Sequence, residues 1–588
     1  MHLTGFSTKI QIWGVLATVL LTISCQGDET TSSPATDPPP EHWLVKTPLK
    51  SGGLDEPMEM AILPNLDILV AQRKGEIMLY SQANQSYEEA GFLDVYHYTP
   101  LEGVNAEEGV MGLALDPEFE ENRQLFIFYA PSDTSVNRLS RFRFEENRLV
   151  QESEQVILEF YSQRDICCHT GGSIAFDNDG LLYLSTGDNS TPFNQPDTDV
   201  QLLGYAPLDN REGFEQYDAR RTSGNSNDLR GKVIRIRVNE DGSYDIPDGN
   251  LYPKGMEKTR PEIYAQGTRN AFRISVDPKN GYLYWGDVGP DARRDSLDVR
   301  GPKGYDELNQ AREAGHFGWP YFIADNLPYN EYDYANDRPG DFFDPERPAN
   351  RSPNNTGIDV LPPAQPAFIY YPYDESVEFP DVGSGGRSIK AGPVYYSDLY
   401  PEETRLHDYF DGKLFFADWI RDWVMVVSMD QEGNYVDMHP FMESRSFYSV
   451  MDMEIGPDGK LYLLEYGKGW FTENENSGLY RIDMDSTRSE PVDALPEDEV
   501  ELARRLIADY GCVACHADQE RSVGPSFVEI ADRYAGVNVT EALKTKIAEG
   551  GSGEWGPVNM PANPAIPDHE LDMLVQYILG FTPEGHQE

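Results

Sequence analysis

Two parts of the chain differ in how apolar and polar residues alternate. From about Trp43 to Asp483, short apolar and aromatic runs alternate with Asp-Gly, Asn-Gly and Pro-Asp-Gly turns, and helical periodicity is sparse. This pattern is typical of β-strands joined by tight turns. Further on, apolar residues recur at helical spacing in two segments: Leu502, Ala503, Leu506, Ile507 and Tyr510, and Leu571, Leu574, Val575, Ile578 and Leu579. The pattern predicts an all-β region followed by an all-α region.

A strand, turn, strand unit recurs within the β-rich region. Related units occupy residues 115–117, 176–183, 276–284, 411–415 and 456–462. Repetition of such units over roughly 440 residues favours a β-propeller, and the loop insertions leave room for six blades. A parallel β-helix is the alternative architecture.

The N-terminus has the layout of an export signal. Lys9 precedes an apolar run from Ile10 to Ile23, and Ser24 stands directly before Cys25. The run is short for a permanent membrane span, and the segment resembles a bacterial lipoprotein signal. We therefore expect a lipid on Cys25 and a lipid-anchored protein in the cell envelope, at the periplasmic or outer-membrane surface. An ordinary cleaved signal is the alternative.

These patterns divide the chain into five segments. We expect a signal peptide at 1–25, a polar, Pro-rich tether at 26–42, a propeller at 43–483, a linker at 484–496 and a haem domain at 497–585.

The charge balance excludes one class of partner. The chain has 48 Lys and Arg against 100 Asp and Glu, a formal charge of -52. Such a field repels phosphates, so nucleic acid partners are excluded. The acidic residues are scattered along the chain, which is typical of a solvated acidic surface.

The five cysteines identify a cofactor. Cys512 and Cys515 are followed by His516 in the Cys-x-x-Cys-His spacing, which lets two thiols bind haem covalently while the adjacent His ligates iron. A zinc site would need ligands that the neighbourhood lacks. Cys167 and Cys168 are adjacent, and either a bond between them or two buried thiols fits the sequence.

The C-terminal region resembles a small monohaem bacterial cytochrome c. The matching stretches, besides the haem motif, are residues 523–527 and the loop at 550–561. The resemblance makes Met560, in a Pro-flanked loop, the expected sixth ligand of the haem iron, with His569 as the competing candidate. His/Met ligation suits electron transfer.

The β-rich region resembles the glucose/sorbosone dehydrogenase family, six-bladed propellers that use pyrroloquinoline quinone (PQQ) and calcium. The matching motifs lie at residues 108–117, 169–176, 186–188, 267–270, 289–290, 306–309 and 318–320. The resemblance covers most of Trp43 to Asp483, and it implies oxidation of a sugar or related polyol.

The chemistry of the matching residues suggests their roles. Alcohol oxidation by hydride transfer needs a base, and His169 is the candidate, with Asp188 to fix its tautomer. Arg269 offers a planar cation to a quinone or carboxylate oxygen, and Asn270 adds hydrogen bonds. A turn or capping role is the alternative for Asp188, and a core position is expected for Trp319.

The resemblance also implies metal and cofactor contacts. It assigns the backbone carbonyls of Gly289 and Pro290 to a calcium ion that touches PQQ, and places Glu307 near a second calcium ion, although Glu307 also suits a turn or cap.

The sequence departs from the family at one cofactor contact. An Arg-x-Arg-Asp run that binds PQQ carboxylates is replaced by Ser449-Val450-Met451-Asp452. Cations from neighbouring loops that could compensate are Arg387, Lys390 and Arg421.

The two regions together predict a membrane-tethered quinoprotein dehydrogenase. The propeller would oxidise a sugar or polyol with PQQ, and the fused haem c would pass electrons to a cytochrome or a membrane respiratory chain. One alternative is a carbohydrate-binding or docking propeller without catalysis, attached to an electron relay. Lactone hydrolysis is another, although it gives the haem no purpose.

Overall fold

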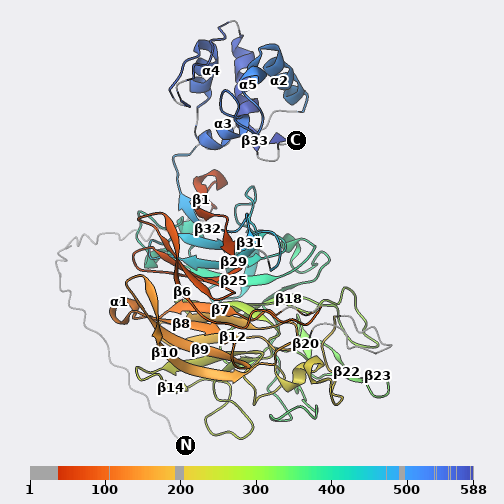
Figure 1. The fold of residues 1–588 in the computed structure, drawn as a ribbon. Helices are drawn as coiled ribbons and strands as arrows, with labels where there is room; N and C mark the ends of the chain where they lie inside the picture. Colours follow the sequence, from red (N-terminus) through yellow and green to blue (C-terminus); the bar gives the residue numbers. More distant parts are fainter. Residues whose placement is uncertain are drawn as a thin grey trace, which may run out of the picture.

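The structure, a computed structural model, describes residues 37–586 except for positions 103, 105, 192–203, 472, 489–496, 536, 538, 554, 557, 565, 583 and 584. The predicted signal peptide, Cys25, most of the predicted tether and residues 489–496 of the predicted linker lie outside the described residues. Figure 1 shows a large β-domain followed by a small helical domain.

The β-domain is a six-bladed propeller, as predicted. Each blade contains four antiparallel strands, and this pairing excludes a parallel β-helix. The first blade contains β3 (Pro57–Ile62), β4 (Ile68–Gln72), β5 (Glu76–Ser81) and β6 (Ser86–Phe92). The second contains β7 (Val110–Leu115), β8 (Gln124–Tyr129), β9 (Val136–Glu145) and β10 (Arg148–Tyr161). The third contains β11 (Gly171–Phe176), β12 (Leu182–Thr186), β13 (Lys232–Val238) and β15 (Ile263–Gln266).

The last three blades complete the ring. The fourth blade contains β16 (Ala271–Val276), β17 (Leu283–Asp287), β18 (Asp306–Ala311) and β24 (Ile369–Tyr371). The fifth contains β25 (Ile389–Tyr395), β26 (Lys413–Asp418), β27 (Trp423–Met429) and β28 (Tyr435–Pro440). The sixth contains β29 (Val450–Ile455), β30 (Leu461–Glu465), β32 (Gly478–Met484) and β1 (Leu44–Ser51). The sixth blade thus takes its outer strand from the N-terminal end of the domain. Leu44 pairs with Met484, which closes the ring.

Short elements decorate the blades. The strands are β2 (Leu54–Asp55), β14 (Tyr244–Asp245), β19 (Gly315–His316), β20 (Phe322–Ile323), β21 (Leu327–Pro328), β22 (Asn330–Asp333), β23 (Arg338–Phe342) and β31 (Glu473–Asn474). The helical turns are η1 (Glu41–Trp43), α1 (Phe119–Asn122), η2 (Glu215–Tyr217), η3 (Ala219–Arg221), η4 (Pro380–Val382), η5 (Ser397–Leu399) and η6 (Asp408–Phe410).

The inner strands β3, β7, β11, β16, β25 and β29 surround the propeller axis, and each carries a β-bulge. In four of them a single bulged residue is buried near the axis: Met58, Met111, Phe272 and Met451. In β25 the register shifts later, between Ala391 and Val394. A bulge changes the direction in which neighbouring side chains point, so its position along each inner strand determines which side chains lie at the end of the propeller axis.

All six inner strands begin on the same face of the propeller, where the second strand of each blade ends. We call this the entry face. It is formed by the segments that precede β3, β7, β11, β16, β25 and β29 and by those that follow β4, β8, β12, β17, β26 and β30. Because β32 runs antiparallel to β30, it ends on the opposite face.

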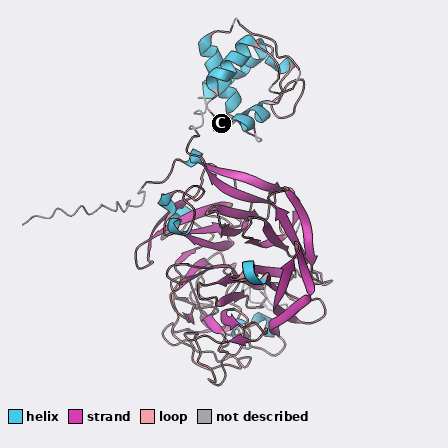
Figure 2. Cartoon of the chain, turned by 90° about the vertical axis from the view of Figure 1, so that its left-hand side faces the viewer, coloured by secondary structure: helices cyan, strands magenta, loops and turns pink. Residues whose placement is uncertain are grey.

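The C-terminal domain is helical (Figure 2). Its helices are α2 (Glu497–Asp509), α3 (Phe527–Tyr534), α4 (Thr540–Glu549) and α5 (Asp568–Leu579), with η7 (Cys512–Ala514) and the short strands β33 (Phe581–Thr582) and β34 (Gly585–His586). Apart from Leu502, which is exposed, the apolar residues predicted at helical spacing belong to its core, in which Ala503, Ile507, Leu571, Leu574 and Val575 are buried. Helix α3 begins with a capping box between Ser526 and Glu529.

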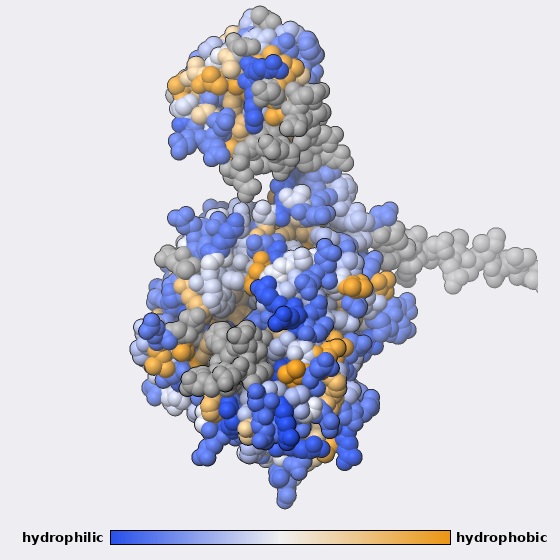
Figure 3. All heavy atoms as spheres, turned by 90° about the vertical axis from the view of Figure 1, so that its right-hand side faces the viewer, coloured by the Kyte–Doolittle hydropathy of each residue, from blue (hydrophilic) through white to orange (hydrophobic). Residues whose placement is uncertain are grey.

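Polar residues cover much of the propeller surface in the view of Figure 3, as the acidic composition predicts. Within the described residues, no helix is both long enough and apolar enough to cross a membrane.

Candidate functional site

His169 lies on the entry face, directly before β11. Cys168 and His169 both have positive φ angles, 95° and 65°. This conformation is costly for residues other than glycine and is concentrated at functional sites. It is held by a hydrogen bond from the backbone N–H of His169 to Glu107 Oε2 at 2.8 Å. Gly187 must lack a side chain here, because a Cβ would lie 2.1 Å from the His169 carbonyl oxygen.

His169 and Asp188 form the buried pair that the sequence predicts. The distance from His169 Nδ1 to Asp188 Oδ1 is 2.7 Å, and the side chains are 4% and 0% exposed. The second carboxylate oxygen, Oδ2, accepts a hydrogen bond from Trp319 Nε1 at 2.7 Å. Burial alone would raise the pKa of Asp188, but His169, Arg269 and Trp319 together hold it below its usual range. Because Asp188 is ionised, it accepts a hydrogen bond from the Nδ1–H group of His169, and Nε2 of His169 is then the unprotonated, basic nitrogen.

Arg269 and Asn270 precede β16 on the same face. Their backbone N–H groups donate to the carboxylate of Asp287, at 2.9 and 2.7 Å. The Arg269 guanidinium donates to the Val288 carbonyl at 2.6 Å and lies 5.8 Å from the Trp319 ring. Asn270 Oδ1 accepts the backbone N–H of Gly171, the first residue of β11. The four predicted residues are therefore linked through the starts of β11 and β16.

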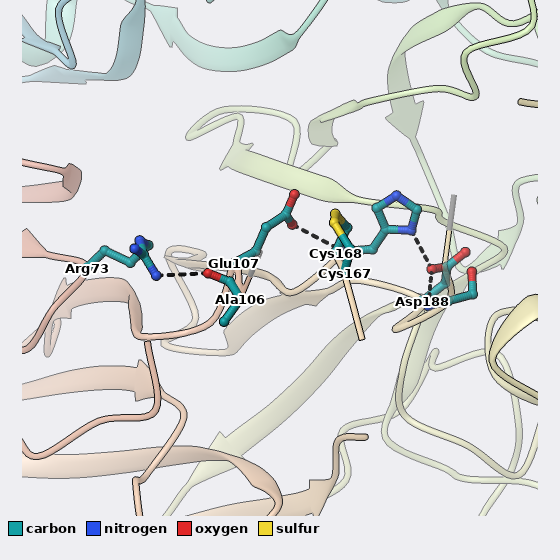
Figure 4. Close-up of a disulfide and its surroundings, with 8 residues drawn as sticks. Arg73, Ala106, Glu107, Cys167, Cys168 and Asp188 are labelled. Carbon is teal, nitrogen blue, oxygen red and sulfur yellow. Dashed lines mark hydrogen bonds and ion pairs between the residues drawn. A yellow bond between two sulfur atoms is a disulfide. The ribbon is translucent and has the colours of Figure 1, made fainter. Parts of the chain in front are cut away.

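The cysteine pair beside His169 is a disulfide in the structure. Cys167 and Cys168 are bonded, with Cα atoms 3.6 Å apart. Figure 4 shows the disulfide with Glu107 on one side and Asp188 on the other. The bond closes a small ring next to the residue that carries the imidazole.

Gly289 and Pro290 do not fit the calcium role that the resemblance assigns them. The Pro290 carbonyl accepts a hydrogen bond from Arg387 Nη2 at 2.6 Å, and Arg387 also pairs with Asp306 at 2.6 Å. A guanidinium in this place repels a divalent cation. The backbone N–H of Gly289 donates to Asp306. We therefore derive no chemistry through a calcium ion at this position.

Glu307 fits a cation better. It lies opposite Asp287 in the β17–β18 ladder, so the two carboxyl groups share one face of the sheet. Burial and Asp287 raise the pKa of Glu307 to about 8, and burial raises that of Asp287 to about 7. Oδ1 of the neighbouring, buried Asn309 has no hydrogen-bond partner among the described residues. Hard oxygen atoms in such a group suit calcium, although the described residues contain no cluster of three or more His, Cys, Asp or Glu suited to a metal.

The family position for two cofactor-binding arginines contains no cation. Met451 is fully buried against the axis, and Ser449 donates its backbone N–H to Asp422. Two of the three proposed substitutes are already engaged. Arg421 donates to the carbonyls of Pro372, Val382, Gly383, Gly385 and Gly386. Arg387 is neutralised by Asp306, which leaves Lys390.

The haem motif forms one wall of a cavity of about 220 Å³ in the C-terminal domain. Cys512, Cys515 and His516 line it together with apolar side chains. His516 Nδ1 lies 2.7 Å from the Pro525 carbonyl oxygen, so this nitrogen carries the proton and Nε2 is left to ligate iron. The two thiols are unpaired, as covalent haem attachment requires. These residues fit haem c.

Met560 also lines this cavity. Its backbone pairs with Gly551 through two hydrogen bonds of 2.9 Å, which fixes the loop. His569 is exposed near the start of α5 and does not line the cavity, and neither does Met573. The structure therefore places Met560, rather than His569, in position to be the sixth ligand.

Sequence reasoning missed three contributors to the propeller site. Glu107 binds the backbone of His169, Asp287 binds the backbones of Arg269 and Asn270, and Trp319, expected only in the core, donates to Asp188. Glu107 is adjacent to a matching motif, and Asp287 stands two residues before Gly289. The available signals were the position of Asp287 at the end of β17 and that of Glu107 in the loop before β7.

Comparison with known proteins agrees with this geometry. The model of the family described as Glucose / Sorbosone dehydrogenase matches residues 54–362. The chain belongs to this family. The cytochrome c family model matches residues 500–582, so a family propeller is joined to a C-terminal cytochrome c domain.

Individual relatives cover each part. Aldose sugar dehydrogenase YliI of Escherichia coli (strain K12) is 22% identical over 456 residues, which are 76% of this chain and 94% of that protein. Cytochrome c-551 of Azotobacter vinelandii is 40% identical over 80 residues, 13% of this chain and 96% of that protein. The crystal structure of a proposed oxidoreductase (glucose dehydrogenase) from Thermus thermophilus shares the fold, with a TM-score of 0.50, 21% identity and coverage of 75% of this chain and 99% of that one.

Proposed function

We propose that this protein is a PQQ-dependent dehydrogenase that oxidises a sugar or related polyol and passes the electrons to its own haem c. The observation that carries the proposal is the buried His169–Asp188 pair on the entry face, next to Arg269 and Asn270. Family membership and the relatives described as sugar dehydrogenases support the substrate class. The fused cytochrome c domain supports an outlet for electrons.

The side chains have distinct tasks in this reaction. The substrate loses a proton from its hydroxyl group and a hydride from the adjacent carbon. His169 Nε2 accepts the proton, and the ionised Asp188 stabilises the resulting imidazolium through Nδ1. Arg269 would offer guanidinium N–H donors to a quinone oxygen of the cofactor and so stabilise negative charge there. PQQ, when bound, supplies the two-electron acceptor.

The haem domain continues the electron path. His516 and Met560 line one cavity and would hold the iron in His/Met ligation. Haem c, when attached, supplies a one-electron acceptor. A cytochrome or a membrane respiratory chain is the proposed downstream partner.

We also propose a cell-envelope location, with the protein anchored to a membrane through a lipid on Cys25. The support is the order of Lys9, the apolar run from Ile10 to Ile23, and Ser24 before Cys25. Globomycin treatment of the producing cells tests this, because it blocks lipoprotein maturation. Accumulation of the unprocessed precursor is the expected result, and unchanged processing contradicts it.

The activity is tested with the full chain, matured in a haem-attaching host and supplied with PQQ and calcium. A panel of aldoses and polyols should reduce the haem, followed by the rise of its α-band. His169→Ala should lower the rate by on the order of 10³-fold while the haem spectrum stays unchanged, and His407→Ala on the far side of the fifth blade is the matched control. No reduction by any sugar in wild-type protein that binds PQQ contradicts the proposal.

A carbohydrate-binding propeller without catalysis is the second candidate. It is favoured by the absence of a cation at Ser449 and Met451. In that case His169→Ala leaves sugar binding intact, and wild-type protein shows no turnover with any acceptor. Calorimetric titration of sugar, run beside the turnover assay, separates the two candidates.

A further inference from the structure

Lys390 is a buried cation without a carboxylate partner. Its side chain is 3% exposed. Its Nζ donates to Ser388 Oγ at 2.8 Å and makes longer contacts with the carbonyls of Ser388 and Ile389, at 3.3 and 3.5 Å. The Phe272 ring centroid lies 4.6 Å away. No ion pair of Lys390 occurs within the described residues.

The acidic groups around Lys390 are already engaged. Asp306 pairs with Arg387, and Asp418 accepts hydrogen bonds from the Tyr371 hydroxyl and from three backbone N–H groups. Glu107 accepts the backbone N–H of His169. Burial, followed by the nearby positive charge of Arg273, lowers the pKa of Lys390 to about 7. Lys390 is thus a buried amine whose charged form an added anion would stabilise.

The contact with Ser388 sets the height of the Lys390 ammonium group along the axis. In β16 and β29 the bulged residues are Phe272 and Met451, and Asn270 and Ser449 stand two positions before them. In β25 the equivalent residue is Ser388, because its carbonyl accepts the backbone N–H of Trp419 as the carbonyls of Asn270 and Ser449 accept those of Val288 and Tyr466. Lys390 lies two residues further along β25, but its side chain reaches back to Ser388 Oγ, which brings its ammonium group level with Asn270 of the candidate site and with Ser449, where the family carries an arginine.

The fifth and sixth blades are neighbours, and their inner strands β25 and β29 are in contact. A cation on β25 at the level of Ser449 is displaced from the family position by one blade only. Arg421 and Arg387 cannot supply this cation. The Arg421 guanidinium already donates to backbone carbonyl oxygens, and the charge of Arg387 is neutralised by Asp306.

We propose that Lys390 binds a carboxylate of the quinone cofactor and so replaces the arginine pair absent from the sixth blade. PQQ carries three carboxylates, and a desolvated ammonium group forms strong, charge-assisted hydrogen bonds to such groups. This inference deepens the proposed function and depends on its choice of cofactor.

Equilibrium binding of PQQ to the full, haem-containing chain tests the inference without turnover. Quenching of tryptophan fluorescence reports the affinity. Lys390→Gln should weaken PQQ binding by about 10- to 100-fold, since a charged hydrogen bond is lost. Lys413→Gln, at the far end of β26, is the matched control and should bind PQQ like the wild type.

The trimethyl ester of PQQ provides the second arm, because it keeps the quinone and lacks the carboxylate charges. Wild type and Lys390→Gln should bind this ester with equal affinity. Lys390→Met retains an unbranched stem of similar reach over Phe272 and serves as a second neutral variant, should Gln prevent folding.

The outcomes separate the two proposals. Wild-type protein that fails to bind PQQ removes the cofactor of the proposed function and, with it, the role of Lys390. Wild-type protein that binds PQQ, with a folded Lys390 variant within twofold of its affinity, overturns the inference alone. Equal loss of affinity for PQQ and for the ester also overturns it, because such a loss reports a distorted pocket.

Discussion

Trp319 donates its indole N–H to Asp188 over 2.7 Å, at the carboxylate oxygen opposite the one that His169 contacts. Trp319, expected from the sequence only as a core residue, thus helps to fix the orientation of the Asp188 carboxylate.

We expect Trp319→Phe to reduce activity without removing it. The change keeps an aromatic ring but deletes the donor, so the pKa of Asp188 rises toward its usual range and the imidazolium of His169 is less well stabilised. The rate of sugar-dependent haem reduction should fall about 3- to 30-fold, with a larger loss at acidic pH. Trp470→Phe, on the exposed rim, is the control, and an unchanged pH profile in Trp319→Phe contradicts the coupling.

The stability of the propeller should depend on pH through Glu307. Its folded-state pKa is about 8, above the value of about 4.3 in an unfolded chain. The folded state therefore holds a proton that the unfolded state releases, and stability falls as pH rises from about 4.5 to about 8. Glu307→Gln should flatten this decline by on the order of 2 to 5 kcal/mol, measured by urea unfolding at pH 5 and pH 9.

The effect of calcium on the melting temperature is a second test of the role of Glu307. A cation bound by Glu307 and Asp287 favours their ionised forms, so calcium should raise the melting temperature most at pH 8. Glu307→Gln should abolish the increase, while Glu432→Gln on an exposed turn should retain it. A calcium effect of equal size in both variants contradicts a site at Glu307.

We expect Met560→Ala to change the haem iron without releasing the haem. The thioether bonds to Cys512 and Cys515 remain, so the Soret band persists, while the loss of the sulfur ligand lowers the reduction potential. Loss of the weak near-infrared band of sulfur-ligated ferric haem is the diagnostic signal. His569→Ala should leave both properties unchanged, and the reverse pattern would assign the ligand to His569.

Thiol counting tests the cysteine assignments. In denatured, haem-containing protein whose signal has been processed, no thiol should react with iodoacetamide, because two sulfurs are bound to haem and two form the Cys167–Cys168 disulfide. Two alkyl groups should be added after reduction, as measured by mass spectrometry. Two additions before reduction would show that Cys167 and Cys168 are free thiols.

The sequence was sufficient for the propeller, the haem domain and the His169–Asp188 pair, because turns, helical spacing and the Cys-x-x-Cys-His motif are local signals. Other features depend on distant parts of the chain. Trp319, which donates a hydrogen bond to Asp188, lies 131 positions from it in the sequence. The contact between Lys390 and the Phe272 ring depends on the packing of two blades, and the poor fit of Pro290 to calcium depends on Arg387, 97 positions away. No local pattern contains such information.

The closure of the ring by Leu44 and Met484 has a consequence for the proposed lipid anchor. Trp43 and Asp485 are joined by a backbone hydrogen bond of 2.8 Å on the face opposite His169. The stem that leads back to the proposed lipid and the stem that leads on to the haem domain therefore leave the propeller from the same place. If Cys25 carries the proposed lipid, the anchor and the haem domain are both attached to the propeller on the face opposite His169, which leaves the entry face pointing away from the anchor.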